Sequence, residues 1–140
     1  MSASDYLENN IIETTLRGAS FPVPSNVYVA LFTADPTDAG VAANEVQASA
    51  WPSYARVDAA LGGTIDSGWT APADGISSNA KALEFSANDG AAAVNVTHFA
   101  LYDAASGGNM LYHAALDSAK QVNVGDVLAF AIGALTVQAS

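Results

Sequence analysis

The sequence predicts a mainly β fold: an antiparallel β-sandwich or barrel-like domain with one amphipathic helix near the N-terminus. Apolar residues recur at helical spacing in one segment, close to the start of the chain. The remainder holds about six to eight short strand-like segments, separated by turn signals roughly every 8–12 residues. The 140-residue length fits one domain, residues 1–140, with the helix at about 4–17 and the β part at about 26–139.

The predicted helix covers Ser4–Arg17. Ser4 is a suitable N-cap, acidic residues follow in the first turn, and Gly18 is a natural residue to end the helix. Its apolar stripe consists of Leu7, Ile11, Ile12 and Leu16. Because an isolated helix of this length is marginally stable, we expect the stripe to dock on the sheet or on a neighbouring subunit.

The segment Asn26–Thr33 is predicted to be the central strand. Side chains on a strand alternate between its two faces, and both faces of this segment are apolar. One face carries Val27, Val29 and Leu31, and the other carries Tyr28, Ala30 and Phe32. We therefore expect this strand to be covered on both sides. The proline of Asp35-Pro36 ends it, because proline has no N–H to donate, and a turn-rich acidic loop follows up to Gly40.

Shorter strands are predicted along the rest of the chain, at Tyr54–Asp58, Ile65–Thr70, Lys81–Ser86, Asn95–Ala104, Met110–Asp117, Gln121–Val124 and Val127–Ala139. Alternation in Asn95–Ala104 places Val96, His98, Ala100 and Tyr102 on one face. The glycine-rich turn Ser106–Asn109 predicts a hairpin with the strand that follows it. Gly133 is expected to mark a bulge or a close backbone approach in the last strand.

The charge balance excludes several classes of partner. Fourteen Asp and Glu face four Lys and Arg, which gives a net charge of −10. Nucleic-acid binding depends largely on basic side chains, so direct binding to DNA or RNA is not expected, and anionic membranes would repel the chain. The acidity is also compatible with a generally acidic proteome, as in a saline habitat. No apolar run is long enough to span a membrane, and the N-terminus lacks secretory features, so we expect synthesis in a cytoplasm.

No residue pattern predicts catalysis, a cofactor or a metal. Cysteine is absent, so disulfides and thiolate sites are excluded. His98 and His113 lie on strands that we expect to pair, but neither belongs to a metal-binding or catalytic motif. The acidic loop with Glu45 does not match a calcium-binding loop. We interpret both histidines as structural, and the acids Asp35 and Asp38 as turn formers.

Two tryptophans stand out in the alanine- and glycine-rich middle of the chain. We interpret Trp51 and Trp69 as covers for the edge of the core. The alternative is that they are exposed aromatic contacts for a partner or a glycan.

Three ordered motifs support a resemblance to a known family. They are LFTADP at Leu31–Pro36, Glu45-Val46 followed by SYAR at Ser53–Arg56, and GDVLAFAIGALT at Gly125–Thr136. On these motifs the chain resembles a family of small structural proteins of tailed bacteriophages that are often labelled tail fibre proteins. The likeness spans about Leu7 to Val137 and departs at Ala48–Pro52, where relatives tend to have a Gly-Gly run. The resemblance implies a virion component without enzymatic activity.

We expect a capsid decoration (cement) protein on the outer head surface, because the chain is compact, acidic and without the repeats of a fibre. Its expected partners are the major capsid protein, other virion proteins and further copies of itself. The predicted contact residues are Leu7, Ile11, Thr33, Asp35, Pro36, Thr37, Asp38, Trp51 and Trp69. The alternative is a tail, tail-fibre or baseplate component that contacts the host surface. A small hydrolase that uses His98 or His113 is a third hypothesis.

Overall fold

The computed structural model describes residues 1–139, and Ser140, the last residue of the predicted domain, lies outside them. The main sheet is antiparallel and five-stranded, with strand order β1-β7-β6-β2-β3. Its strands are β1 (Ser2–Ala3), β2 (Tyr28–Phe32), β3 (Val57–Asp58), β6 (Val94–Tyr102) and β7 (Met110–Val122). The sheet ends at β1 and β3 and does not close on itself, so the fold is open and not a barrel.

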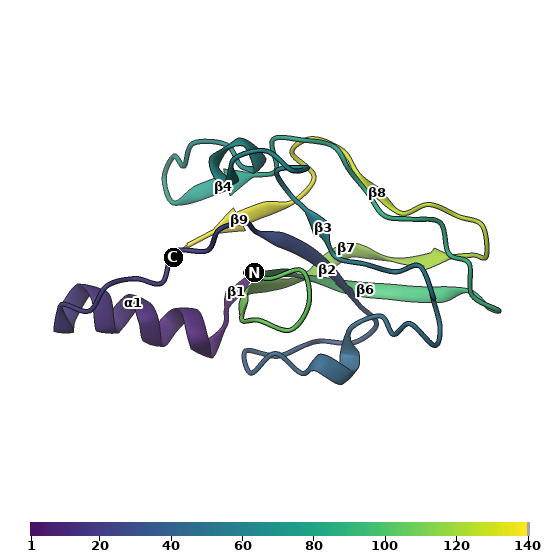
Figure 1. Ribbon diagram of the computed structural model, residues 1–140, viewed down its shortest axis with the longest axis horizontal. Helices are drawn as coiled ribbons and strands as arrows, with labels where there is room; N and C mark the ends of the chain where they lie inside the picture. The colour runs from purple at the N-terminus through teal and green to yellow at the C-terminus, as the bar shows by residue number, and fades with distance from the viewer. Residues whose placement is uncertain (140) are drawn as a thin grey trace.

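A second, smaller layer covers one face of this sheet (Figure 1). It consists of two antiparallel pairs of short strands: β4 (Ile76–Ser78) with β9 (Thr136–Gln138), and β5 (Leu83–Glu84) with β8 (Ala129–Phe130). Two 3-10 turns complete the regular structure, η1 (Ala42–Asn44) and η2 (Ile65–Gly68). The prediction of a mainly β, antiparallel fold with one N-terminal helix is confirmed.

The helix α1 (Asp5–Arg17) begins and ends where the sequence predicts. The hydroxyl of Ser4 accepts a hydrogen bond from the Leu7 N–H at 3.1 Å, which satisfies one of the free N–H groups at the helix start. Gly18 adopts a left-handed conformation with φ 76°, and its N–H bonds to the Glu13 carbonyl. Within the described residues no helix is long and apolar enough to cross a membrane.

The core lies between the two layers, and β2 runs through it. Val29 and Leu31 belong to the main apolar cluster, which faces the second layer. Ala30 and Phe32 point to the opposite face, where they pack with Ala100, Tyr102 and Met110. Four of the five residues of β2 are buried, so the prediction of a strand covered on both sides is confirmed. The middle position of the five-stranded sheet belongs to β6, however, and β2 lies beside it.

The predicted alternation of β6 is wrong at its N-terminal end. Val96 was placed on the face of Ala100 and Tyr102, but it packs in the main cluster together with Phe99 and Leu101. The cause is an irregularity in the register of β6 and β7, because Val96 pairs with Lys120 whereas His98 pairs with Ala115. Thr97 alone therefore lies opposite the four residues 116–119 of β7, and the irregularity shifts the side-chain alternation.

Three other predicted strands need correction. Of the residues 65–70, the first four form the turn η2 and not a strand. The last two pair only locally, through an isolated antiparallel bridge of Trp69 with Asn79 and a bond from the Thr70 N–H to the Ser78 carbonyl. The strand at 110–117 runs on to Val122, so 121–124 is not a separate strand. The last predicted strand is divided into β8 and β9 by a turn at Gly133, which has φ 79°.

Two buried asparagines hold the second layer in place. The amide of Asn79 donates to the carbonyls of Lys81 and Ala131, and its oxygen accepts from the Leu135 N–H. Asn88 likewise donates to the carbonyls of Ala92 and Val122. Since buried polar groups are costly unless they are bonded, these amides satisfy backbone groups of loops that lack ladder partners.

Candidate functional site

The apolar stripe of α1 is mostly uncovered. The helix projects beyond one end of the sheet, beside both chain ends (Figure 1). Leu7 is buried, with 4% of its surface exposed. The exposed fraction then rises to 42% at Ile11, 52% at Ile12 and 79% at Leu16. The expected docking of the stripe on the sheet is therefore complete only at Leu7, and within residues 1–139 the rest of the stripe is only partly covered.

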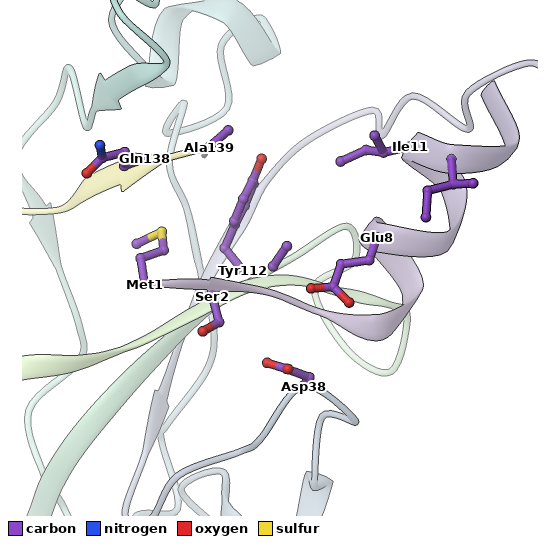
Figure 2. Close-up of a pocket in the computed structure, with 10 residues that line it drawn as sticks. Met1, Ser2, Glu8, Ile11, Asp38, Tyr112, Gln138 and Ala139 are labelled. Carbon is purple, nitrogen blue, oxygen red and sulfur yellow. The ribbon is translucent and has the colours of Figure 1, made fainter. Parts of the chain in front are cut away.

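A groove of about 490 Å³ separates this helix from the end of the sheet. Its wall on one side is α1, and its other side is formed by residues of β1, β7 and β9. Its lining residues include Glu8, Ile11, Ile12, Asp38, Tyr112 and Gln138. Figure 2 shows the Tyr112 ring standing in this space, with Ile11 directed toward it and the carboxylates of Glu8 and Asp38 at its rim. We call this space the helix groove.

The start of the helix is fixed to both β7 and the acidic loop. The N–H of Ser4 donates to the Leu111 carbonyl at 2.9 Å, and the Ser4 hydroxyl donates to the Met110 carbonyl. The N–H of Asp5 donates to the Asp38 carbonyl at 2.9 Å. Because these bonds link segments far apart in the sequence, they set the position of α1 and bring Asp38 to the rim of the groove.

The carboxylates of the acidic loop are used within the fold. Asp35 Oδ1 accepts a hydrogen bond from the Thr37 N–H at 2.8 Å, a turn geometry that accompanies the positive φ of 58° at Thr37. Asp38 Oδ1 lies 2.6 Å from His113 Nε2, and Asp35 Oδ1 lies 3.6 Å from His113 Nδ1. Among residues 1–139 no cluster of three metal-ligating side chains occurs. The loop acids thus position the loop on β7.

A smaller apolar pocket of about 230 Å³ adjoins the helix groove. Tyr112 borders both spaces. The other side chains of the pocket that matter here are those of Val27, Trp69, Leu101 and Val137. Most of its lining residues are apolar, and the polar side chains among them are those of Trp69, Ser77 and Tyr112, so it suits an apolar side chain better than a sugar.

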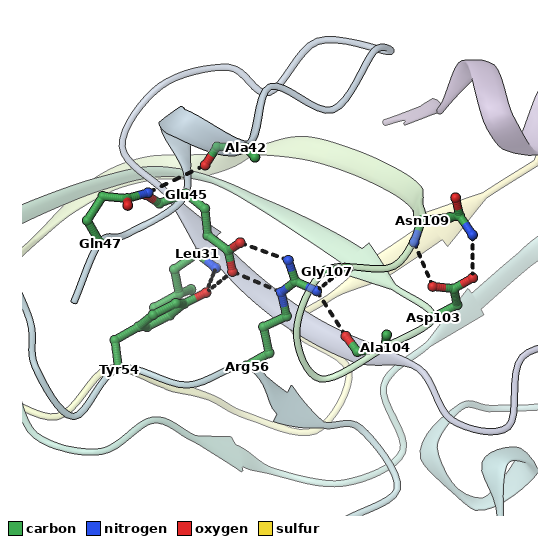
Figure 3. Close-up of polar contacts among 10 residues, drawn as sticks. All are labelled: Leu31, Ala42, Glu45, Gln47, Tyr54, Arg56, Asp103, Ala104, Gly107 and Asn109. Atoms are coloured by element: carbon green, nitrogen blue, oxygen red, sulfur yellow. Dashed lines mark hydrogen bonds and ion pairs between the residues drawn. The ribbon is translucent and has the colours of Figure 1, made fainter.

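Arg56 forms the most connected polar cluster of the structure, shown in Figure 3. Its Nε and Nη2 atoms donate to the two oxygens of Glu45, both at 2.9 Å. Its Nη1 donates to the carbonyls of Ala104 and Gly107 in the β6–β7 turn, at 2.9 and 2.8 Å. The guanidinium carbon lies 3.6 Å from the ring centre of Tyr102. We call these residues, with Tyr54, the Arg56 cluster.

Tyr54 completes this cluster from the opposite side of Glu45. Its hydroxyl donates to Glu45 Oε2 at 2.7 Å and accepts from the Leu31 N–H at 3.0 Å. Burial, followed by the charge of Glu45, raises the pKa of Tyr54 well above its ordinary value. Burial lowers the pKa of Arg56, but its hydrogen bonds and charge attraction to Glu45 outweigh this and raise it overall. Both groups therefore keep their protonated forms.

The predicted contact residues fall into two groups. Ile11 and Asp38 line the helix groove, and Asp38 and Asp35 both lie against His113. Thr33 and Thr37 are exposed on the same loop as these two acids. The others are not free surface. Leu7, Pro36 and Trp51 are buried within the chain, and Trp69 is half-buried in the apolar pocket.

The two tryptophans differ in their surroundings. Trp51 is fully buried, its indole N–H donates to the Ala87 carbonyl at 3.1 Å, and its ring packs against Tyr54. It therefore covers the core, as one of the two interpretations predicted, and does not form an exposed contact. Trp69 packs against the core and keeps one side open to the apolar pocket.

The two histidines do not share a site. His113 is held by the loop acids, whereas His98 Nδ1 lies 2.8 Å from the hydroxyl of the adjacent Thr97. In the cross-strand register His98 faces Ala115 and His113 faces Ala100. These positions agree with the interpretation of both residues as structural.

Sequence reasoning missed the Arg56 cluster and the role of Tyr112. Glu45 and Arg56 belong to the motif that supports the family resemblance, and their opposite charges in a chain with four basic residues were the available signal. Tyr112 carries no such signal, because its place beside the groove depends on the pairing of β1 and β9 with distant segments.

Comparison with known proteins gives one family. A family model described as "Podophage GP4 fiber I protein gp80" matches residues 2–138. This match contains α1, all the described strands, the Arg56 cluster and every lining residue of the helix groove except Met1 and Ala139. A search of curated proteins finds no significant match.

Proposed function

The chain belongs to the podophage GP4 fiber I protein gp80 family, and on this premise we propose that it is a structural component of a phage tail fibre. Family membership makes the protein a phage virion structural protein. The observation that carries the finer proposal is the fibre description of a model that matches residues 2–138.

The family description favours the tail-fibre alternative over capsid decoration. The features that suggested decoration were a compact fold, net acidity and the lack of repeats. All three are equally compatible with a short fibre domain that is held in place by contacts with other virion proteins. The main sheet is rigidly tied to its loops by the Arg56 cluster, and the uncovered stripe of α1 offers a surface for such contacts.

We further propose that this role involves no catalysis. A hydrolase would need a nucleophile and a base placed together in an accessible pocket, with a third group to orient the base. His113 is buried, and its Nε2 lies against the Asp38 carboxylate. The hydroxyl that contacts His98 is that of Thr97, the adjacent residue on the same strand. If His98→Gln or His113→Gln abolished a hydrolytic activity of the purified folded protein, this part of the proposal would fail.

The location is tested on virions. We expect antibodies against this chain, followed by gold labelling and electron microscopy, to mark the tail. Virions without the protein are expected to lose host adsorption while their DNA-filled heads keep the same thermal stability. Gold on the head surface, together with unstable heads and normal adsorption, would instead establish the decoration role and overturn the fibre proposal.

A further inference from the structure

We propose that the helix groove and the adjoining apolar pocket together bind an apolar segment of another virion protein that carries a lysine or arginine. This inference rests on the proposed function, since it names the chemistry of the partner through which the chain is held in the fibre. Four observations support it: the uncovered helix, the sign of the charge at the groove, the anchor pocket and the unsuitability of a second copy.

The first observation is apolar surface that the fold itself does not cover. Ile11 and Ile12 line the groove while about half of each residue remains exposed. Leu16 extends the same stripe one turn further and is the most exposed of the three. A short helix with such a stripe gains stability when a partner covers it, and exposed apolar patches of this kind mark interaction sites.

The second observation is negative charge. Glu8 and Asp38 are the two lining side chains with a formal charge at neutral pH. The partial positive charge at a helix start, roughly half a unit, is offset here by Asp5 and Glu8. Asp38 also contacts His113 at 2.6 Å, so among the described residues Glu8 is the lining carboxylate without a side-chain partner of its own. The chain as a whole has a net charge of −10, so a basic segment is attracted and an acidic one repelled.

The third observation is the pocket beside Tyr112. It is apolar and measures about 230 Å³, a size that accommodates one bulky apolar side chain. Interfaces are commonly anchored by such a residue in a dry pocket, with charged groups at the rim. Here Trp69 and Val137 form the pocket, and Glu8 and Asp38 lie on the groove side of Tyr112. The partner segment therefore combines an apolar anchor with a nearby cation.

The fourth observation is that a second copy of this chain does not provide such a segment. Arg56 and Lys81 donate to carbonyls inside the fold. Arg17 lies at the exposed end of α1, but Glu13, 3.0 Å away on the same helix, offsets its charge. Lys120 is exposed, but its neighbours on β7 are small or polar, Ser118, Ala119 and Gln121. A second copy would also bring a further net charge of −10. The occupant is therefore a different, basic polypeptide.

The test is an NMR titration of the intact ¹⁵N-labelled chain with three model peptides of about twelve residues. One peptide contains leucine and lysine, the second leucine and glutamate, and the third serine and lysine. We expect saturable shifts of the amides of Glu8, Ile12, Tyr112 and Trp69 with the leucine–lysine peptide alone. The other two peptides separate the contribution of charge from that of apolar contact.

Variants then locate the site. Ile12→Ser is expected to weaken binding of the leucine–lysine peptide by roughly tenfold, because it removes apolar contact on the helix side of the groove. Glu8→Lys is expected to weaken it by about fivefold or more. Its matched control is Glu84→Lys, which makes the same charge change at an exposed position on β5 and should alter affinity by less than about twofold. If Ile12→Ser unfolds, Ile11→Ser replaces it.

Three outcomes would overturn the inference. They are shifts confined to surfaces away from the groove, equal loss of affinity in Glu8→Lys and Glu84→Lys, and sedimentation of the wild-type chain as an oligomer that Ile12→Ser dissociates. The last outcome would assign the stripe to a second copy.

Labelling of heads together with peptide binding at the groove would refute only the fibre location. Tail labelling without peptide binding would refute only the groove inference.

Discussion

Two arginines of this protein pair with a glutamate at nearly the same distance in opposite surroundings, Arg56 through two nitrogens and Arg17 through one. Arg56 Nη2 lies 2.9 Å from Glu45, and Arg17 Nε lies 3.0 Å from Glu13. The side chains of the first pair are 7% and 13% exposed, whereas those of the second are 70% and 52% exposed. Only the first pair also bonds to backbone carbonyls and covers an aromatic ring.

The comparison separates the part of the molecule that maintains the fold from the part that is left for a partner. Around Arg56, charges are buried and every one of them has a matched group, so removing one leaves another unpaired. Along α1, the charges remain in water and the apolar residues are exposed. Stability should therefore depend strongly on the Arg56 cluster and weakly on the outer half of α1, while binding should depend on them in the reverse order.

The largest expected effect is at Arg56. Arg56→Met should lower the free energy of unfolding by about 3–5 kcal/mol, because it leaves the buried Glu45 without its cation and two carbonyls without their donor. Arg17→Met is the matched control, and it should change stability by less than about 0.5 kcal/mol. Urea unfolding followed by tryptophan fluorescence measures both. Similar midpoints for the two variants would contradict the comparison.

A smaller effect is expected in the loop that joins the two regions. Pro36 is fully buried, so Pro36→Ala should cost about 1–2 kcal/mol through lost apolar burial and a more flexible unfolded chain. At the neighbouring position, Asp35→Asn keeps an oxygen that can accept the Thr37 N–H and should cost less than about 0.5 kcal/mol. Thermal unfolding of the two variants distinguishes them. Equal tolerance of both changes would mean that the loop is not held by its buried proline.

Next in size is the start of the helix. Ser4→Ala should lower stability by about 1 kcal/mol, since it removes the cap of α1 and one bond to β7. Thr15→Ala is a suitable control, because its exposed hydroxyl bonds only within the helix, to the Ile11 carbonyl. Amide hydrogen exchange should show faster exchange in the first turn of α1 for Ser4→Ala alone. Unchanged protection there would show that β1 suffices to hold the helix.

The smallest effect on folding is expected at the tip of the stripe. Leu16→Ser should change the free energy of unfolding by less than about 0.5 kcal/mol, because the side chain already lies in water. Calorimetry on the isolated chain checks this. A loss of more than about 1 kcal/mol in the free energy of unfolding would indicate that Leu16 is covered in the free protein. The outer half of α1 would then belong to the part of the molecule that maintains the fold.

The parts of the fold that were predictable from the sequence depend on neighbouring residues. The cap at Ser4, the end at Gly18 and the two faces of β2 follow from local hydrogen bonding and side-chain alternation. The turn Ser106–Asn109 also follows, since Gly107 and Gly108 adopt positive φ angles there. Each of these features can be recognised within one short segment.

The parts that were not predictable depend on a distant partner. Val96 faces the core because β7 carries extra residues opposite Thr97, and nothing within β6 signals that mismatch. The choice between the two interpretations of Trp51 also depends on a distant segment, because the carbonyl of Ala87 accepts the indole N–H of the buried ring. For the candidate site, the helix and the acidic loop were predicted as contact elements, but their meeting at Tyr112 follows from strand pairing that the sequence pattern does not encode.

The irregular pairing of β7 opposite Thr97 has a consequence for aggregation between copies of the protein. Among the described strands, β7 has β1 as its only outer neighbour, so its outer edge is unpaired beyond His113. Long, flat edges of this type recruit identical strands and lead to aggregation. The four residues opposite Thr97 interrupt the regular edge, and Asp117 and Lys120 place charges on it. This geometry should allow many copies to be concentrated in one particle without joining sheet to sheet.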